Sequence, residues 1–301
     1  MNISTVAVVI ENDERYSDGI SGALNSLARF FEKSNINYIV AFPDSELIPT
    51  LLEVPVDTVF LLLSETNAAS GKIQGLLELM DIPCAVKLSP SAPWLVSKSN
   101  LKDFLMVNNI ASLPSVTINY NDEIPKEMVP CAVKPARGSM GKGVSIVTET
   151  SQMAVAVEEA LRWDSSVVIE RFSSGMNITC AVYNGAVLGS AQVNGNDETT
   201  EHFIPPELSR NRIRSMENTA KKIAQKCMLS GPVTVDFIAS DDSNDYVIDV
   251  NLYPSLDPAG VFSRISLASG IRHDDMLRSV LTSGNKTETK TFRDELTQIS
   301  F

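Results

Sequence analysis

The first third of the chain alternates short apolar runs with stretches in which apolar residues recur every three or four positions. The apolar runs are residues 5–10 (TVAVVI), 37–42 (NYIVAF) and 57–63 (DTVFLLL). Helical spacing is found at Ile20, Leu24, Leu27 and Phe31, and again over residues 71–81. Strands that alternate with helices predict a parallel sheet covered by helices, so we expect an N-terminal α/β domain over residues 1–92.

The next block, residues 93–172, has strands around a glycine-rich loop. A proline-containing segment, LSPSAPWLVSKS, separates it from the first block. The expected elements are a helix at 100–109, strands at 116–120, 131–135, 144–149 and 166–172, and a helix at 151–163. The loop ARGSMGKG joins two of these strands. We therefore expect a second, smaller domain over residues 93–172.

The last block, residues 173–301, has two hairpins separated by a long helix. Strands at 177–184 and 186–193 meet at Asn184-Gly185, a dipeptide that favours a tight β-turn. A polar loop is expected at 194–203, a helix at about 207–229, a second hairpin at 231–255 and a helix at 263–269. Gly231 is expected to be the left-handed residue that ends the long helix. The polar tail, 284–301, has no predicted element.

Three oxygen-bearing side chains mark the second hairpin, GPVTVDFIASDDSNDYVIDVNLYPS. Asp249 and Asn251 are two positions apart and therefore share one face of their strand. Antiparallel pairing across the acidic turn brings Asp236 beside them. Such a set, open to solvent on one side, is what Mg²⁺ binds together with substrate phosphates. The pattern also fits the solvent face of an amphipathic hairpin, and from these residues alone both interpretations stay open.

A lysine and a glutamate end two otherwise apolar strands of the middle block. Lys134 follows CAV and Glu170 follows SVVI, where a charge is costly unless a partner meets it. An anion would satisfy Lys134, and an adenine amino group or backbone amides would satisfy Glu170. The glycine-rich loop could cover phosphates, although it precedes a strand, whereas Walker and dinucleotide-binding loops open a helix. An edge strand with a snorkelling lysine and an ordinary glycine-rich turn are the alternatives.

Composition narrows the partners and the compartment. The net charge is −12 and no Lys/Arg-rich run occurs, which argues against nucleic acid or an anionic membrane as a partner. The four cysteines are far apart and form no C-x-x-C, which argues against a zinc or redox site. The N-terminus lacks a signal-peptide pattern, and no apolar run approaches the ~20 residues that span a bilayer. We expect a cytoplasmic protein with reduced thiols.

The order of these features resembles the ATP-grasp fold, and the whole chain most resembles the D-alanine–D-alanine ligases. The segments that carry the resemblance are DTVFLLL…GKIQGLLELMDIP, SKSNLKDFLMVNNIASLPS and VDFIASDDSNDYVIDVNLYPS. The resemblance implies an α/β (α+β) ATP-grasp fold with a Rossmann-like N-terminal domain containing a parallel sheet. A small central lid domain (93–172) and a C-terminal mixed-sheet domain (173–301) with the metal site would follow. The implied cofactors are ATP and two Mg²⁺ ions.

The resemblance also assigns roles residue by residue. Lys98 and Lys134 would contact the ATP phosphates, and Lys134 and Lys142 would serve catalysis. The other nucleotide-binding residues would be Ser139, Met140 and Gly141 over the phosphates, Glu170, Arg171, Phe172 and Ser173 at the adenine, and Asn177 at the ribose position. Asp236, Asp249 and Asn251 would bind metal, and Glu14 and Ser255 would lie at the substrates. Separately, Arg264 could bind a substrate carboxylate or be a solvated helix residue.

Several positions depart from the family pattern. Residues 64–71 (SETNAASG) replace its H-G-x-x-G-E-D-G stretch, and Asn177 replaces the glutamate on the ribose. Thr234 replaces the arginine two residues before the first metal ligand, and Ser255 replaces the glycine after the proline. Both of these positions help to stabilise the oxyanion in the family. The loop at 194–203 also lacks the expected basic and aromatic residues. We expect a largely intact nucleotide and metal side and an altered acceptor side.

The resemblance implies an ATP-dependent carboxylate–amine ligase. A substrate carboxylate would be phosphorylated, the amine of a second substrate would attack the acyl phosphate, and ADP and phosphate would be released. The partners would be an amino acid or another small carboxylic acid together with an amine, and the family implies a homodimer. Two alternatives stay open. One is an ATP-grasp ligase that acts on a peptide or protein terminus or in secondary metabolism, and the other is a nucleotide-binding regulatory protein without ligase activity.

Overall fold

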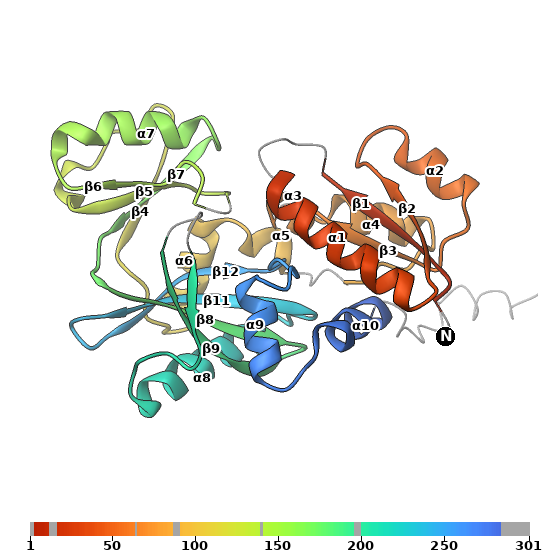
Figure 1. Ribbon diagram of the computed structural model, residues 1–301. Helices are drawn as coiled ribbons and strands as arrows, with labels where there is room; N and C mark the ends of the chain where they lie inside the picture. Colours follow the sequence, from red (N-terminus) through yellow and green to blue (C-terminus); the bar gives the residue numbers. More distant parts are fainter. Residues whose placement is uncertain are drawn as a thin grey trace, which may run out of the picture.

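Three β-sheets follow one another along the chain (Figure 1). The computed structural model describes residues 3–11, 17–63, 65–86, 91–138, 141–195 and 200–283. The first sheet is parallel, and the named strands of the other two pair antiparallel. The predicted α/β (α+β) class is confirmed. The division into domains at residues 92 and 172 stays a prediction.

The apolar runs of the first block form the parallel sheet β2-β1-β3. Its strands are β1 (Thr5–Ile10), β2 (Asn37–Ala41) and β3 (Thr58–Leu62). The helices of this block are α1 (Ser17–Lys33), α2 (Leu47–Glu53), α3 (Glu65–Ala69) and α4 (Lys72–Leu79). Val6 and Val8 pack on one face with α1, while Ala7 and Val9 pack on the other with α2 and α4. Burial on both faces explains why the strand sequences are continuous apolar runs.

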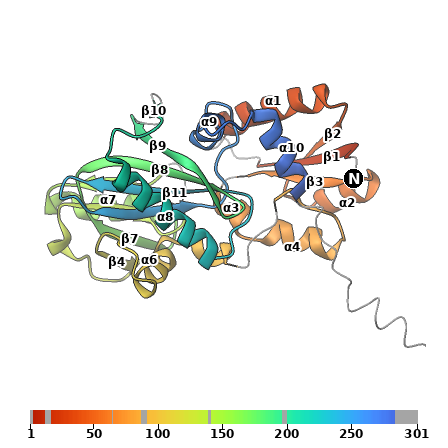
Figure 2. The same cartoon turned by 90° about the horizontal axis from the view of Figure 1, so that it is seen from below.

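Helices from the far end of the chain complete the core of this first sheet. They are α9 (Val261–Ala268) and α10 (His273–Ser283), and α10 was not predicted. Phe262 and Leu277 belong to the same buried cluster as Val8 and Phe30. The Arg278 guanidinium lies 5.5 Å from the ring centroid of Phe30. Figure 2 shows α10 running beside α1 and the first sheet.

The second sheet has the order β4-β7-β5-β6. Its elements are β4 (Ser115–Asn119), β5 (Cys131–Pro135), β6 (Ser145–Val147), β7 (Ser166–Arg171) and α7 (Met153–Leu161), with short 3-10 turns at Lys126–Met128 and Thr150–Gln152. Val133 and Ile169 pack beneath α7 on one face. Because side chains alternate along a strand, Lys134 and Glu170 lie on the opposite face.

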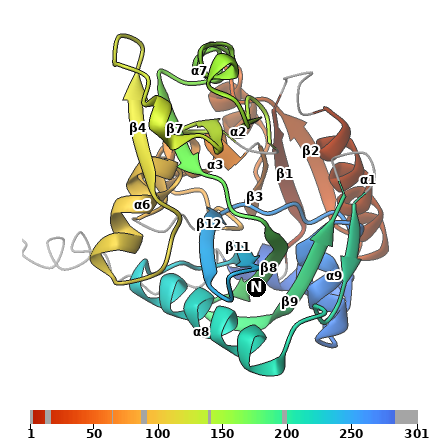
Figure 3. The same cartoon turned by 90° about the vertical axis from the view of Figure 1, so that its left-hand side faces the viewer.

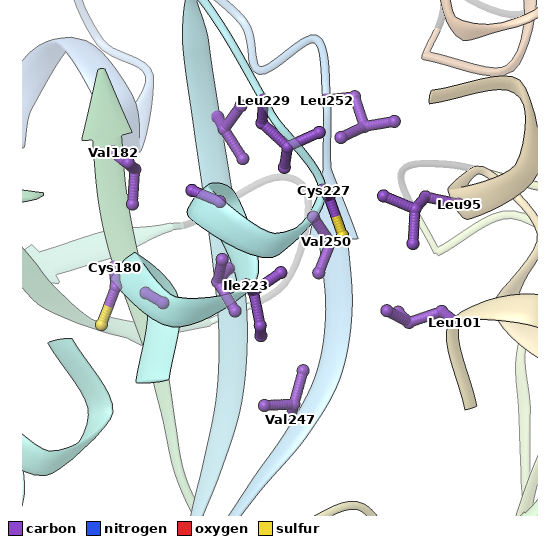
Figure 4. Packing of buried hydrophobic residues seen from close by; sticks show 14 of the residues in the cluster. Leu95, Leu101, Cys180, Val182, Ile223, Cys227, Leu229, Val247, Val250 and Leu252 are labelled. Carbon is purple, nitrogen blue, oxygen red and sulfur yellow. The ribbon is translucent and has the colours of Figure 1, made fainter. Parts of the chain in front are cut away.

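The third sheet has the order β10-β9-β8-β11-β12. Its strands are β8 (Gly175–Tyr183), β9 (Ala186–Asn194), β10 (Glu201–Phe203), β11 (Pro232–Ser240) and β12 (Asp245–Asn251). One face packs on α8 (Arg210–Lys226), α5 (Ala92–Leu95) and α6 (Lys98–Val107), and Figure 4 shows Ile223, Leu101 and Val250 meeting there. The expected mixed sheet is antiparallel in its named strands, with one isolated parallel bridge between Ser112 and Val247.

Helix α6 lies between the second and third sheets (Figures 1 and 3). Its buried residues are Lys98, Leu101, Lys102 and Leu105. Leu101 and Leu105 join the apolar cluster of the third sheet. The two lysines are four positions apart, so they project from one side of the helix. This helix therefore delivers two ammonium groups to the junction of the two sheets.

Two predictions about the last block were wrong. The polar loop at 194–203 ends in strand β10, which pairs with β9 although its sequence, EHF, is not apolar. The left-handed residue that ends α8 is Met228 (φ 50°), because the Leu229 N–H donates to the Ala224 carbonyl at 2.8 Å. Gly231 also has a positive φ, but it belongs to the turn before β11.

Among the described residues, five helices end in this same motif. The left-handed residues are Asn35, Asp81, Asn109, Met228 and Gly270. Each is followed by isoleucine or leucine, whose N–H donates to a carbonyl five residues earlier. In the described part of the chain, no helix is both long and apolar enough to cross a bilayer.

Candidate active site

Two carboxylates face each other at the centre of the third sheet. Asp236 of β11 is paired in register with Asp249 of β12, and Thr234 is paired with Asn251. The hairpin pattern predicted this neighbourhood, and the strand register confirms it. Because Asp249 and Asn251 are two positions apart, all three oxygen-bearing side chains lie on one face of the sheet.

Hydrogen bonds fix these three side chains. Thr179 Oγ1 donates to Asp236 Oδ1 at 2.6 Å, and the Val250 N–H donates to Asp249 Oδ1 at 3.0 Å. The Tyr253 N–H donates to Asn251 Oδ1 at 2.9 Å. The first bond comes from neighbouring strand β8, and the other two come from the residues that follow each side chain. The carboxylate and amide oxygens therefore have set directions before any ligand arrives.

The two aspartates have pKa values that shift in opposite directions. Burial and the neighbouring Asp249 charge raise the pKa of Asp236 to about 6, against the Thr179 hydrogen bond, which lowers it. Burial alone would also raise the pKa of Asp249, but the Lys98 and Lys134 ammonium groups and the Val250 N–H hold it below its usual value. A further cation beside Asp236, in addition to these two ammonium groups, would reduce the repulsion between the two carboxylates.

Lys98 connects the Asp249 carboxylate to the start of the glycine-rich loop. Its Nζ lies 2.9 Å from Asp249 Oδ2 and donates to the Gly138 carbonyl at 2.9 Å. The backbone N–H of Lys98 donates to the Ala136 carbonyl at 2.7 Å, so the start of α6 is tied to the end of β5. Only 8% of Lys98 is exposed. An ammonium group held this way is placed to meet an anion between the loop and β12.

A second cluster of charges lies where the second sheet meets α6. Lys134 of β5 and Glu170 of β7 are diagonal neighbours on the inner face of that sheet, and their charged groups are in contact. Lys102 of α6 contacts the other oxygen of Glu170. Glu170 is 2% exposed and each lysine is 8% exposed. A carboxylate so deeply buried needs such partners, because an unpaired charge there would be very costly.

Sequence patterns did not single out Lys102. Its position in NLKDFLMVNN is compatible with the solvated face of an amphipathic helix. The signal that could have found it is its spacing of four from Lys98, which puts both lysines on one stripe.

Comparison with known proteins shows the family of the chain. A family model described as D-ala D-ala ligase C-terminus matches residues 100–282, more than half of the chain. The chain belongs to the D-alanine–D-alanine ligase family.

Relatives and solved structures extend the similarity over most of the chain. A D-alanine–D-alanine ligase from Anaeromyxobacter is 28% identical over 260 residues, which cover 79% of this chain and 83% of the relative. One from Pediococcus pentosaceus is 25% identical over 245 residues, covering 76% and 70%. The Bacillus anthracis ligase complexed with ATP superposes with a TM-score of 0.83 at 21% identity, covering 94% of this chain and 98% of that one. The structural likeness confirms the predicted ATP-grasp ligase fold.

The connection from the second to the third sheet of this family member contains the expected adenine-binding residues. The N–H groups of Arg171 and Phe172 donate to the Pro114 and Pro130 carbonyls at 2.9 and 3.0 Å. Ser173 Oγ lies 2.8 Å from Ser240 Oγ. The N–H groups of the first two residues thus serve the protein, and an adenine would have to use other atoms of this connection.

Two further nucleotide-side expectations concern Asn177 and the glycine-rich loop. Asn177 lies on β8 with an exposed side chain. Gly141 and Gly143 have positive φ, and a Cβ on Gly143 would lie 2.6 Å from Trp163 Cδ1. Lys142 Nζ lies 6.0 Å from the centroid of that ring. Ser139 and Met140 lie outside the described residues.

On the acceptor side, the structure describes two of the three expected residues, Ser255 and Arg264. Ser255 is exposed in the loop after β12, and Arg264 is exposed on α9. Burial and the Arg264 charge lower the pKa of His202 on β10. Glu14 lies outside the described residues.

The stretch that replaces the family's H-G-x-x-G-E-D-G motif contains α3 and the turn before α4. Asn67 of α3 donates to the Glu11 carboxylate at the end of β1. Gln74 of α4 donates to the Ala68 carbonyl and to the Tyr253 hydroxyl, each at 2.7 Å. This network connects the first sheet to the residues just after β12.

Proposed function

We propose that the protein is an ATP-dependent ligase that forms an amide bond between a small carboxylic acid, such as an amino acid, and an amine. Membership of the family supports this, since its relatives are named D-alanine–D-alanine ligase and a similar structure was solved with ATP. The observation that carries the proposal is the convergence of Lys98 and the Lys134–Glu170 pair with the Asp236, Asp249 and Asn251 oxygens at one junction.

The proposed reaction has two balanced steps. An oxygen of the substrate carboxylate bonds to the γ-phosphorus of ATP while the bond from that phosphorus to ADP breaks. The amine nitrogen then bonds to the acyl carbon, phosphate leaves with the electrons of the C–O bond, and the amine loses a proton. The protein needs little covalent chemistry for this, so positioning and charge neutralisation supply most of the catalysis.

The lysines of the junction would neutralise phosphate charge. Lys98 already lies between Asp249 and the loop that begins at Gly138, and Lys134 projects from the strand before that loop. Both are almost fully buried, so their attraction for phosphate oxygens is screened less than at a surface. We assign them to phosphate binding, with Lys134 and Lys142 serving the transfer step.

The oxygen set on the third sheet fits Mg²⁺. Two carboxylates and one amide oxygen lie on one face, and burial together with the Asp249 charge raises the pKa of Asp236, so a cation bound there would offset both effects. Among the described residues, no group of three or more His, Cys, Asp or Glu could hold a metal, so the proposed set takes the Asn251 amide oxygen as its third ligand. Bound there, one or two Mg²⁺ ions would neutralise phosphate charge during transfer.

A second candidate function is nucleotide binding without ligation. The observation that favours it is Thr234, which is 3% exposed and pairs with Asn251. It brings no positive charge to the position where the ligase family has an arginine, so oxyanion stabilisation would need another source. This candidate predicts ATP binding without ADP release for any pair of substrates.

The experiment is ADP release with Mg-ATP against D- and L-amino acids, singly and in pairs, with hydroxylamine as a surrogate amine. Turnover that requires two amino acids would identify a dipeptide ligase. Turnover with one amino acid plus hydroxylamine would show acyl-phosphate chemistry with a different natural amine. ATP binding with silence across the panel would favour the second candidate. Lys134→Met is the matched variant, and normal turnover in it would contradict the assigned role.

We further propose a cytoplasmic homodimer that handles small molecules and binds neither nucleic acid nor membranes. The net charge of −12 and four cysteines without disulfides support the compartment and the partners. The dimer rests on family resemblance alone. Light scattering of the purified protein would test it directly.

A further inference from the structure

Glu170 is shared by two lysines that come from different parts of the fold. Lys134 reaches one carboxylate oxygen from the adjacent strand, and Lys102 reaches the other from α6. The Lys102 ammonium also lies 3.5 Å from the Leu113 carbonyl oxygen. Its neighbours Leu101 and Leu105 are fully buried in the core of the third sheet, so the backbone that carries Lys102 is firmly anchored.

The balance of charge in this cluster is unusual for a buried site. Two ammonium groups share one carboxylate among three buried side chains, and the Asp249 charge acts on both lysines from the third sheet. A simple ion pair of Lys134 with Glu170 would be neutral and closed upon itself. With Lys102 present, Lys134 shares the carboxylate, so its ammonium group, which has three N–H donors, keeps bonding capacity for a further anion.

We propose that Lys102 is a positioning residue for nucleotide binding: it holds one oxygen of Glu170 so that the Lys134 ammonium stays available to an anionic phosphate. This role depends on the proposed function in one respect, namely that the anion bound by Lys134 is a phosphate of a nucleotide. Lys102 acts through Glu170: its ammonium group contacts that carboxylate and the Leu113 carbonyl, and the Asp249 charge also acts on it. Burial lowers the pKa of Lys102 and the Glu170 charge opposes that shift, in keeping with a lysine whose charge depends on this carboxylate.

Binding of Mg-ADP, measured by calorimetry, tests the proposal without any need for turnover. Lys102→Met should weaken binding by about tenfold or more, because both oxygens of Glu170 would then pair with the Lys134 ammonium group and compete with the phosphate for it. Lys102→Arg should keep most of the affinity, since arginine also donates to the carboxylate. In Lys102→Met/Glu170→Gln the charge that holds Lys134 is gone while an amide oxygen remains to accept from an adenine amino group, so binding should recover relative to Lys102→Met. Lys221→Met, on the exposed side of α8, is the matched control and should bind like the wild type.

Three outcomes would overturn the proposal. The first is a cooperatively folded Lys102→Met variant that binds Mg-ADP as tightly as the wild type. The second is a double variant that binds more weakly than Lys102→Met, because the Glu170 carboxylate would then contribute to binding directly and not through Lys134. The third is a wild-type protein that binds no nucleotide. If the binding pattern holds while no carboxylate and amine pair gives ADP release, the ligase function fails and the role of Lys102 stands.

Discussion

Replacing Asp236 with Asn should stabilise the ligand-free protein at neutral pH, although it removes a proposed metal ligand. Asp236 has a pKa of about 6, against an ordinary value of 3.8. A group whose folded pKa is raised this way destabilises the fold once it is ionised. The penalty is absent below pH 3.8 and complete above about pH 6. Asn keeps the oxygen that accepts from Thr179 and removes the charge.

The expected gain follows from the size of the shift. At about 1.4 kcal/mol per pKa unit, the displacement corresponds to about 3 kcal/mol of unfolding free energy. Asp236 keeps some contact with solvent, which screens its charge, so we expect a gain of about 1–3 kcal/mol above pH 6. The gain should shrink as the pH falls towards 4, where the wild-type carboxyl becomes protonated.

Asp249→Asn is the matched control with the opposite sign. The folded pKa of Asp249 is lowered, so its ionised form stabilises the fold above the unfolded pKa, and this contribution is lost as the pH falls through the folded pKa. Its loss would remove the carboxylate partner of Lys98, and because 30% of the Asp249 side chain is exposed we expect a cost of about 1–3 kcal/mol at neutral pH.

Urea unfolding followed by circular dichroism would measure both effects, with a chelator present and the pH varied from about 4 to 8. The reasoning is refuted if the two variants shift the midpoint in the same direction at neutral pH. It is also refuted if the gain from Asp236→Asn does not depend on pH.

Three further outcomes are expected. Gly143→Ala should lower the melting temperature and slow ADP release, because a Cβ would meet Trp163. Gly141→Ala has open space around it and should show only the backbone strain of its positive φ, about 1 kcal/mol; equal effects would contradict this contrast. Met228→Gly should raise the melting temperature and increase the unfolding free energy by about 0.5–1 kcal/mol, because glycine adopts the left-handed conformation without strain. Little packing would be lost, since Met228 is 66% exposed. Lys98→Met should lower kcat at least about a hundredfold at saturating Mg-ATP, and an unchanged kcat would remove Lys98 from the site.

The hairpin of β11 and β12 could be predicted because both of its determinants, the alternation of side chains and the turn, are local. The period of two in VTVDFIA and YVIDVNL sets the faces, and the short acidic turn sets the register, so Asp236 had to lie near Asp249. The strands of the first sheet were predictable for a related reason, since burial on both faces leaves a continuous apolar run.

Lys102 could not be assigned from the sequence because its burial depends on a strand 68 residues away. A lysine in a helix usually reaches solvent, and nothing near it announces Glu170. Strand β10 depends in the same way on its pairing with β9. The end of α8 was predicted wrongly for another reason, because the glycine at position 231 is the residue type that usually adopts the left-handed conformation. Met228 adopts it instead, and Leu229 after it is buried in the core of the third sheet.

Helix α10 has a consequence for the way the chain is made. The first sheet is synthesised early, but Leu277, Val280 and Leu281, which share its core with Val6 and Val8, come last. At about 5–20 residues per second, the ribosome needs about 10–40 s to pass from residue 86 to residue 281. During that time the nascent strands carry an incompletely covered apolar face. We expect this face to recruit chaperones, and shortening the chain before α10 should prolong their hold on it.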